Sequence, residues 1–554
     1  MVAGGQNPRP IIIVGGGPVG MVLAMTFAQL GVGSTVVNIE TDSRWRPKGS
    51  THNARTMEHY RRLGLTPAIR RVGLPPDHPT DVGYFTSLNG WELARLAMPS
   101  EAEKMRQVRA ATVTDQTPEP LFRCNQMYVE RELYRHLKTV GLAEMRFGWR
   151  CAGYTDYGDG VSVEIENVAT GARETLRGAY VVGCDGGHSV IRRALGIKYG
   201  GEVLAPQAYG TGATVSTHMR APALYDRGIL KRNCWQHWIV NGATRSLLTT
   251  LDGEGEFLFN TRCRSVDDPP DADFITRVFL ATVGEAVPFE FIGHWPWTAG
   301  HALVADSFGR GRALLAGDAV HLFTPTGGFG MNTGIEDAVN LAWKLAAMVQ
   351  GWGGPGLIPS YEIERRPIAF RNTGHSKRLA RNVGETPALA QMGEDTPEGA
   401  AARKQAGDYL ATFGEEFASL GVQLGARYDD SPIVAHDGTA APPDDPAVYV
   451  PSGKPGGRAP HVWLADRSSL YDHLGKFFTL VRFGGAKSDG AALMVAAKAR
   501  GVPLDVLDVA VPEARDLYQA DMALIRPDLH VAWRGNRAPG DSDALLARVT
   551  GAAV

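Results

Sequence analysis

The sequence predicts an α/β fold in several parts: a parallel βαβ unit at the N-terminus, a mainly β middle segment and a small α/β domain at the C-terminus. Three observations support this prediction. The apolar run 11–14 ends in glycines and precedes a helix-like segment, the stretch 200–296 has no long helical period, and strand-like and helix-like segments alternate beyond residue 455. The 554 residues are enough for two or three domains, because single cores stop growing at about 250 to 300 residues.

The N-terminal unit begins with Ile11–Val14, a continuous apolar run typical of a strand that is buried on both faces of a parallel sheet. A helix is expected from about Pro18 to Leu30, and Ser34–Ile39 is expected to form a second strand. The length of this crossover suits parallel pairing of the two strands. We therefore expect the chain to open with a βαβ unit.

Hydrophobic periodicity predicts further elements. Val161–Glu166 alternates apolar and polar residues after a Gly-Asp-Gly turn, which predicts one arm of a half-exposed hairpin. Tyr180–Cys184 is predicted as a buried strand. Ile335–Ala346 carries apolar residues at a spacing of about 3.6, which predicts a helix with one buried face just after a glycine-rich loop.

The middle and the C-terminal end differ in pattern. From Gly200 to Pro296 aromatic residues are scattered through short strand-like runs, so we assign this stretch to a mainly β domain. Residues 437–460 are dense in Ala, Gly, Asp and Pro, which favours a surface connection. Beyond them the pattern predicts a strand, a helix, a strand and a hairpin, at 477–483, 491–500, 504–509 and 523–533.

Charge and cysteine content exclude several classes of protein. The 57 Lys and Arg residues balance 59 Asp and Glu residues, so no strong field would recruit nucleic acid or an anionic membrane, and a small molecule is the expected partner. The 5 cysteines form no CxxC pair, which argues against disulfides and against a metal site such as zinc. The apolar segment 11–37 is broken by glycines, so we expect a cytoplasmic protein without signal peptide or membrane span.

A glycine motif follows the first predicted strand. Gly15, Gly17 and Gly20 match GxGxxG, with Pro18 among them, and Glu40 ends the second strand 20 residues after Gly20. Glycine lets the backbone approach a pyrophosphate, the helix N-terminus supplies N–H groups, and a carboxylate at the strand end can accept ribose hydroxyls. The motif predicts a Rossmann-like dinucleotide site and does not by itself distinguish FAD from NAD.

Two later segments narrow the prediction. The run 185–192, DGGHSVIR, follows the buried strand, and the run 317–332, GDAVHLFTPTGGFGMN, precedes the amphipathic helix. They match the DG and GD motifs of the class A flavoprotein monooxygenases, the p-hydroxybenzoate hydroxylase superfamily, which the chain resembles. The resemblance also covers shorter segments: 55–58, Gln126 with Glu130, 337–345 and 361–366.

This resemblance implies a cofactor, FAD, and a transiently bound reductant, NAD(P)H. Asp318 would bind the ribityl chain, Arg55 and Gln126 would contact the cofactor, and Pro325 would lie over the reacting part of the ring. Backbone N–H groups at the start of the following helix would stabilise the negative charge of reduced flavin. The expected cofactor-binding residues are Gly15, Gly17, Pro18, Gly20, Glu40, Arg55, Gln126, Asp185, Arg192, Asp318, Pro325, Gly328, Gly330, Met331 and Asn332.

Asp185 and Arg192 resemble the motif that the family shares between FAD and the transient NAD(P)H site. A helix cap is the structural alternative for Asp185, because Asp ahead of a helix is favoured for capping alone. His321, inside the GD motif, is interpreted as a structural histidine.

The C-terminal third has a resemblance of its own. Residues 455–461, 471–475 and 526–534 are similar to the thioredoxin-like extension of phenol-hydroxylase-type members, which include polyketide hydroxylases. No cysteine lies beyond Cys263, so this extension cannot perform dithiol chemistry. The expected domains are an FAD-binding domain at 1–200 and 300–400, with part of the substrate domain inserted near 75–105, a β substrate domain at 201–299, a helical connection at 401–454 and a thioredoxin-like domain at 455–554.

The implied activity is hydroxylation of a phenolic or polyketide aromatic ring with O2, through a C4a-hydroperoxyflavin, by a single-component monooxygenase. Two alternatives stay open: Baeyer-Villiger oxygenation or epoxidation of a polyketide, and a flavin-binding redox sensor without turnover. The sequence leaves the nicotinamide, the ring position and the oligomeric state open, and a homodimer is compatible with it.

The catalytic base is also open. His52 lies in the segment that borders the substrate ring in relatives, and a histidine can take a phenolic proton near neutral pH. An exposed loop histidine is the alternative. Phenol-hydroxylase relatives place an acid here, whereas this chain has GSTHN at 49–53. Trp235, Trp238, Trp295 and Trp297 could line an aromatic pocket, although core positions are commoner for tryptophan in a β domain.

Overall fold

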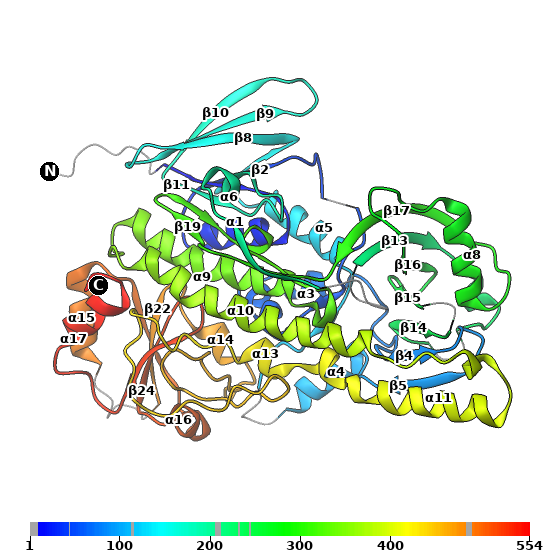
Figure 1. Cartoon of the computed structure of the whole chain (residues 1–554). Coiled ribbons are helices and arrows are strands. Elements are labelled where there is room, and N and C mark those ends of the chain that lie inside the picture. Colours follow the sequence, from blue (N-terminus) through cyan, green and yellow to red (C-terminus); the bar gives the residue numbers. More distant parts are fainter. Residues whose placement is uncertain are drawn as a thin grey trace.

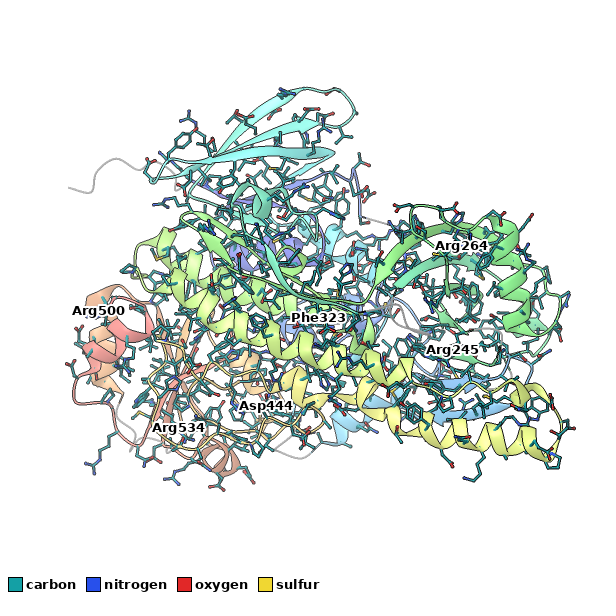
Figure 2. All side chains as sticks on the ribbon, in the orientation of Figure 1. Arg245, Arg264, Phe323, Asp444, Arg500 and Arg534 are labelled. Atoms are coloured by element: carbon teal, nitrogen blue, oxygen red, sulfur yellow. The ribbon has the colours of Figure 1, made fainter. Side chains whose placement is uncertain are left out.

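The computed structural model describes residues 9–43, 45–111, 116–204, 212–230, 233–242, 245–483 and 490–553, and parts of the predicted domains that fall in the gaps lie outside these described residues. Figure 1 shows a central region around α1, a small sheet of β8 to β10 beside it, a β-rich region around β13 to β17, and a C-terminal domain around β22 and β24. The long helices α9 and α10 cross the middle. Phe323 lies near the centre, between Arg245 of the β-rich region and Asp444 in the approach to the C-terminal domain (Figure 2).

The central sheet has six strands, in the order β19 (Gly309–Arg310), β20 (Ala313–Leu315), β11 (Tyr180–Gly183), β1 (Ile11–Val14), β2 (Ser34–Asn38) and β7 (Ala143–Phe147). All pairs are parallel except β19 with β20. Every residue of β1, β11 and β20 is buried, as expected for parallel strands covered on both faces. The predicted βαβ unit is therefore present.

Two helices carry the cofactor motifs. α1 (Pro18–Gln29) begins at the proline of the glycine motif, and α9 (Gly330–Gln350) packs along it. Along α9, residues 332–347 are all buried. The N-terminal parts of the two helices lie side by side, since a Cβ at Gly334 of α9 would be 2.8 Å from Val19 Cγ2 of α1.

The strands β8 (Trp149–Asp156), β9 (Val161–Asn167) and β10 (Arg173–Gly178) form an antiparallel sheet. The predicted hairpin arm is β9, which pairs with both neighbours. Two smaller sheets join the domains: β12 (Tyr199–Val203) with β18 (His301–Ala305) and β21 (His321–Leu322), and β3 (Thr51–His52) with β6 (Phe122–Arg123).

The β-rich region is a seven-stranded sheet in the order β17 (Glu290–Ala299), β13 (Gly212–Arg220), β16 (Glu256–Arg262), β15 (Arg245–Thr250), β14 (Gln236–Val240), β4 (Val82–Phe85) and β5 (Glu92–Leu96). The last two strands come from a far earlier part of the chain, and β4 pairs with β14 in parallel. This region also contains a helix, although no long helical period was expected between residues 200 and 296. α8 (Ala272–Val283) is a helix of 12 residues whose Ile275, Phe279 and Val283 are buried in the core of this region.

The remaining helices connect the domains. α10 (Leu357–Gly384) runs over 28 residues beside α9, and α11 (Pro397–Leu410) packs against β5. Shorter helices near the site are α2 (Ala54–Arg62), α5 (Gln126–Leu137), α6 (Val190–Ala194) and α12 (Gly414–Ala418). Among the described helices, none combines the length and the apolar character that a membrane span needs.

The C-terminal domain has four strands in the order β23 (Leu504–Asp508), β22 (Phe478–Arg482), β24 (Met522–Ile525) and β25 (Val531–Gly535). β22 and β23 are parallel, and β24 is antiparallel to both of its neighbours. The helices α15 (Ala491–Arg500), α16 (Pro512–Tyr518) and α17 (Ser542–Val549) complete the domain. This βαβαββα order is that of the thioredoxin-like fold, as the sequence predicts.

Candidate active site

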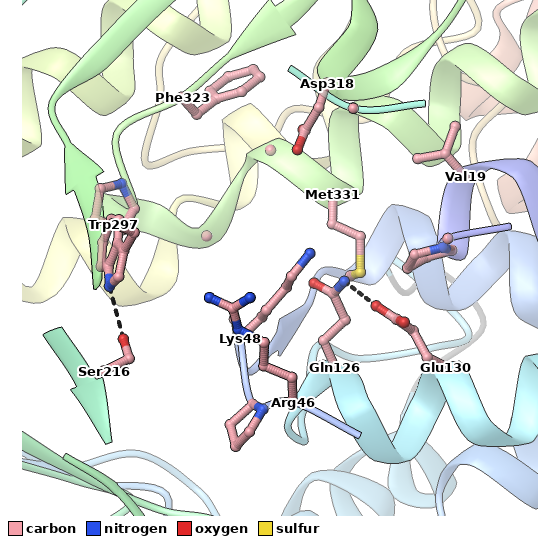
Figure 3. A pocket seen from close by; sticks show the side chains of 18 of the residues that line it. Val19, Arg46, Lys48, Gln126, Glu130, Ser216, Trp297, Asp318, Phe323 and Met331 are labelled. Carbon is pink, nitrogen blue, oxygen red and sulfur yellow. Dashed lines mark hydrogen bonds between the residues drawn. The ribbon is translucent and has the colours of Figure 1, made fainter. Parts of the chain in front are cut away.

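A cavity of about 820 Å³ lies between the central sheet and the seven-stranded sheet. Figure 3 shows Asp318, Phe323 and Met331 on one side of it and Arg46, Lys48 and Gln126 on the other. The glycine motif, the DG segment and the GD segment all contribute to its wall. The cavity therefore brings together the three motifs that the sequence places more than a hundred residues apart.

The glycine loop is built for close approach. Gly15 has φ +112°, and a Cβ at this position would lie 2.2 Å from the carbonyl oxygen of Cys184. Gly15, Gly17 and Pro18 line the cavity. Gly20 does not, and its role is packing: a Cβ there would lie 1.9 Å from the carbonyl oxygen of Gly15. These glycines let the N-terminus of α1 reach the cavity wall, where free N–H groups can receive a pyrophosphate.

Four polar side chains surround the same half of the cavity. Glu40 lies just past the end of β2, the position expected for a carboxylate that accepts hydrogen bonds from ribose hydroxyls. Gln126 is the first residue of α5 and donates a hydrogen bond from its Nε2 to Glu130 Oε1. Asp318 lies in a short 3-10 turn and its main-chain oxygen accepts a hydrogen bond from Tyr199. All four of Glu40, Gln126, Glu130 and Asp318 line the cavity.

The loop 325–330 forms a further part of the cavity wall. Gly327 and Gly328 have φ +79° and +65°, values that favour glycine. Within α9 the Thr333 N–H donates to the carbonyl of Phe329 at 2.8 Å, so the N–H groups of residues 330–332 precede the first hydrogen bond of the helix. Pro325, Gly328, Gly330 and Met331 line the cavity. This end of α9 can stabilise a negative charge placed before it.

Asn332 contributes through its side chain without lining the cavity. Its Nδ2 donates to the main-chain oxygens of Thr51 at 2.9 Å and Gly328 at 2.6 Å, and its Oδ1 accepts from the Asn53 N–H at 3.0 Å. The residue therefore ties the 325–330 loop to the segment before α2.

Asp185 and Arg192 have separate roles. Asp185 lines the cavity, and its Oδ2 accepts hydrogen bonds from the N–H groups of Val190 at 2.7 Å and Ile191 at 3.4 Å. Burial raises its pKa. Arg192 lies outside the cavity wall and donates to Gly187 O at 2.9 Å and Ala319 O at 3.3 Å. It therefore holds the DG segment against the GD segment, and the expected direct contact with a cofactor is not supported.

Arg55 does not take the position expected for a residue that contacts the cofactor. Arg55 faces the C-terminal domain: its guanidinium donates to Glu58 at 3.0 Å and to the main-chain oxygen of Asp528 at 2.6 Å, and it does not line the cavity. Asn53 caps α2, because its side-chain oxygen accepts a hydrogen bond from the Thr56 N–H at 2.8 Å.

His52 is fully buried against Tyr60 and Phe122, at ring centroid distances of 5.9 and 6.4 Å. Burial lowers its pKa to about 3, and it does not line the cavity. Because its ring does not line the cavity and burial disfavours its protonated form, this geometry does not support His52 as the base. His321 is structural, as interpreted: its Nε2 lies 2.7 Å from Asp337 Oδ2 in the core.

The other half of the cavity is aromatic. Trp235, Trp238 and Trp297 line it, and Trp297 Nε1 donates to Ser216 Oγ at 2.8 Å (Figure 3). Trp235 and Trp238 are also buried in a hydrophobic cluster, so the pocket and core interpretations both hold for them. Trp295 instead packs under the Arg46 guanidinium, 4.8 Å from the ring centroid. This half suits a flat aromatic ligand.

Sequence reasoning missed two ionisable residues in this half. Arg123 on β6 and Glu416 on α12 line the cavity and are buried, with 4% and 8% exposure. Neither belongs to a motif, and Glu416 lies in the segment expected to be a helical connection. Only their position in the folded structure, where both side chains line the cavity, identifies them.

The cavity fits FAD in its chemistry. The glycine loop and the N-terminal ends of α1 and α9 offer N–H groups, the carboxylates of Glu40 and Asp318 suit hydroxyl groups, and the 325–330 loop borders the aromatic half. Gly15 leaves room that any larger side chain would fill.

Comparison with known proteins agrees with this geometry. The FAD binding domain family matches residues 9–376, and the family "aromatic-ring hydroxylase, C-terminal" matches residues 452–553. The FAD-dependent monooxygenase apdD of Emericella nidulans is 32% identical, over 98% of this chain and 90% of the relative. The phenol 2-monooxygenase of a Pseudomonas species is 27% identical, over 97% and 91% of the two chains.

The similarity to solved structures covers nearly the whole chain. The rebeccamycin biosynthetic enzyme RebC with reduced flavin superposes with a TM-score of 0.86 and 34% identity, over 99% of each chain. The flavin-dependent monooxygenase PieE, in complex with FAD and substrate, gives a TM-score of 0.87 and 26% identity, over 98% and 99% of the chains. The chain therefore belongs to the FAD-dependent class A flavoprotein aromatic hydroxylases, with the C-terminal domain of the phenol-hydroxylase type.

Proposed function

We propose that this protein is a single-component monooxygenase that uses FAD, NAD(P)H and O2 to hydroxylate a phenolic ring of a simple phenol or of an aromatic polyketide. One observation carries the proposal: a single cavity joins the loop 325–331, at the start of α9, to a wall of Trp235, Trp238 and Trp297. A ring held against these tryptophans would lie beside the loop.

The residues of this chain have three tasks: they bind FAD, they orient the substrate and they exclude water from the cavity. The glycine loop and Glu40 suit the adenosine and pyrophosphate end of FAD, and Asp318 with Gln126 suits its polar linker. When bound, FAD supplies the electrons from NAD(P)H that activate O2. The aromatic wall removes water from around the substrate and sets the face that it presents.

Relatives support the substrate class. Named relatives act as phenol 2-monooxygenase and 2,4-dichlorophenol 6-monooxygenase, and others are putative polyketide hydroxylases. A RebC structure contains bound 7-carboxy-K252c. The three tryptophans of this chain offer flat apolar surface of the kind such rings need.

The test is a panel of phenols and hydroxylated polycyclic aromatics, measured for stimulated NADH and NADPH oxidation with mass and NMR analysis of products. We expect a product with one added oxygen atom on an intact aromatic ring, labelled when 18O2 is supplied. An ester or an epoxide would instead establish the alternative oxygenation. A flavin that is reduced without any oxygenated product across the panel would favour the redox sensor. The homodimer and the cytoplasmic location stay predictions.

A further inference from the structure

Arg123 is a buried cation that forms no ion pair with any residue the structure describes. Its Nη2 donates to the main-chain oxygen of Phe417 at 2.9 Å, its Nη1 donates to Thr51 Oγ1, and its guanidinium lies 4.3 Å from the Trp235 ring centroid. Among the residues the structure describes, no carboxylate forms an ion pair with it, and its Nε has no hydrogen-bond partner. Burial lowers its pKa to about 9, so it still carries its charge at neutral pH. An unpaired buried charge is costly, which points to an anionic ligand in the cavity.

Glu416 lies at the same end of the cavity. Its carboxylate accepts a hydrogen bond from the backbone of Gly327 in the loop that borders the flavin half. Burial raises its pKa to about 7, and the Arg123 charge opposes this rise. Burial, together with the Glu416 charge, raises the pKa of Tyr84 on β4 well above its usual value.

The outward side of α12 carries different charges. There Glu415 pairs with Arg378 and, at 3.4 Å, with His375 of α10. Glu416 itself forms no ion pair within the described part of the chain, and with a pKa of about 7 it can exchange a proton near neutral pH.

We propose that Glu416 accepts the proton of a ring hydroxyl and that Arg123 stabilises the resulting oxyanion. The substrate O–H bond breaks, the proton joins the Glu416 carboxylate, and the electron pair stays on the oxygen beside the guanidinium. The anionic ring is then electron-rich at its ortho and para carbons. This inference rests on the proposed hydroxylation and adds its polar contacts: the substrate is a phenol whose oxygen lies between Arg123 and Glu416.

A structural role is the competing explanation, because Glu416 also holds the Gly327 N–H. The variant Glu416→Gln separates the two. An amide oxygen can still accept the hydrogen bond from Gly327, so a purely structural role would survive, whereas proton acceptance would not. Glu415→Gln, on the same helix but outside the cavity wall, is the matched control.

The experiment measures kcat/KM against pH for wild type and both variants, with the best phenol of the panel and with a fluorinated analogue that is already ionised at the assay pH. For the neutral phenol, wild type should lose activity below about pH 7, and E416Q should fall by roughly 10² to 10⁴ and lose this acidic limb. With the ionised analogue, E416Q should recover most of the lost rate. FAD content should be equal in all three proteins.

Two results would overturn the assignment: an E416Q variant that keeps the acidic limb, or one that is equally impaired with both phenols. Failure of the proposed function is distinct, because wild type itself would then give no hydroxylated product. For Arg123, the variant Arg123→Met should bind the ionised analogue at least about tenfold more weakly, as the loss of a charged hydrogen bond implies, while Arg123→Lys should retain part of this affinity. Equal affinity in R123M would remove Arg123 from the site.

Discussion

Arg526 and Glu364 form a two-pronged ion pair, with Nη1 to Oε1 at 2.7 Å and Nη2 to Oε2 at 2.8 Å. Both side chains are fully buried, and 162 positions separate them in the sequence. Lys344 and Asp528 complete the cluster, at 2.7 Å from Glu364 and 2.5 Å from Arg526. The C-terminal domain is therefore fastened to α9 and α10 by charges inside the protein.

Removal of this cation should be costly. Arg526→Met leaves the carboxylates of Glu364 and Asp528 buried without the guanidinium charge. We therefore expect the free energy of unfolding of the holoenzyme to fall by about 3 to 5 kcal/mol. Arg500→Met is the control, because it breaks a pair with Asp543, which is 61% exposed, and should change stability far less. Denaturant unfolding followed by fluorescence measures both. Equal small effects would show that the cluster is not holding the domain.

The glycine at position 20 should be irreplaceable. In Gly20→Ala the new methyl group would meet the Gly15 carbonyl oxygen at 1.9 Å, so we expect a loss of about 1 to 3 kcal/mol in stability, with weaker FAD retention. Gly374→Ala is a matched change in a helix with nothing within 4 Å, and it should be neutral or stabilising by up to about 1 kcal/mol. Thermal unfolding and the flavin to protein absorbance ratio report the outcome. A G20A protein as stable as G374A would contradict the packing role.

Purified protein should be yellow with bound FAD, and Asp318→Ala should release it. A carboxylate that accepts ribityl hydroxyls contributes about 1.5 to 3 kcal/mol, so the Kd for FAD should rise roughly 10- to 150-fold. Asp306→Ala changes another exposed aspartate, one that does not line the cavity, and should leave the Kd unchanged. Titration of the apoprotein with FAD gives the values. Unaltered affinity in D318A would remove Asp318 from the binding site.

Glu416 should also make stability depend on pH. Burial raises its pKa from 4.5 to about 7, so the folded protein binds this proton more tightly than the unfolded chain does. The resulting stabilisation is present below pH 4.5 and is lost as pH rises through about 7. Relative to E416Q, wild type should therefore lose up to about 3 kcal/mol between about pH 5 and about pH 8. Denaturant unfolding at the two pH values measures this difference.

Glu415→Gln is again the control, since Glu415 is half-buried and paired with Arg378. A pH-independent difference between wild type and E416Q would mean that Glu416 is ionised throughout this range. That result would also weaken its assignment as a proton acceptor.

The sequence by itself determined the features that depend on short stretches of chain. The strand 11–14, the helix from Pro18 and the α9 motif could be predicted because periodicity and glycine placement act over a few residues. The order of strands and helices in the C-terminal domain could also be predicted from the sequence pattern. The 12-residue helix α8 was missed, although its buried residues Ile275, Phe279 and Val283 recur at every fourth position.

Only the tertiary structure decided which side chains reach the cavity. Arg55 and His52 lie in the expected segment, yet neither side chain lines the cavity. Arg55 contacts the C-terminal domain, and His52 packs against Phe122 in the interior. Glu416 and Arg123 come from separate parts of the chain, and packing of α12 beside β6 brings them to one end of the aromatic pocket. Motifs record local backbone needs, whereas burial, pKa and side-chain direction depend on partners far away in the sequence, so no local pattern contains them.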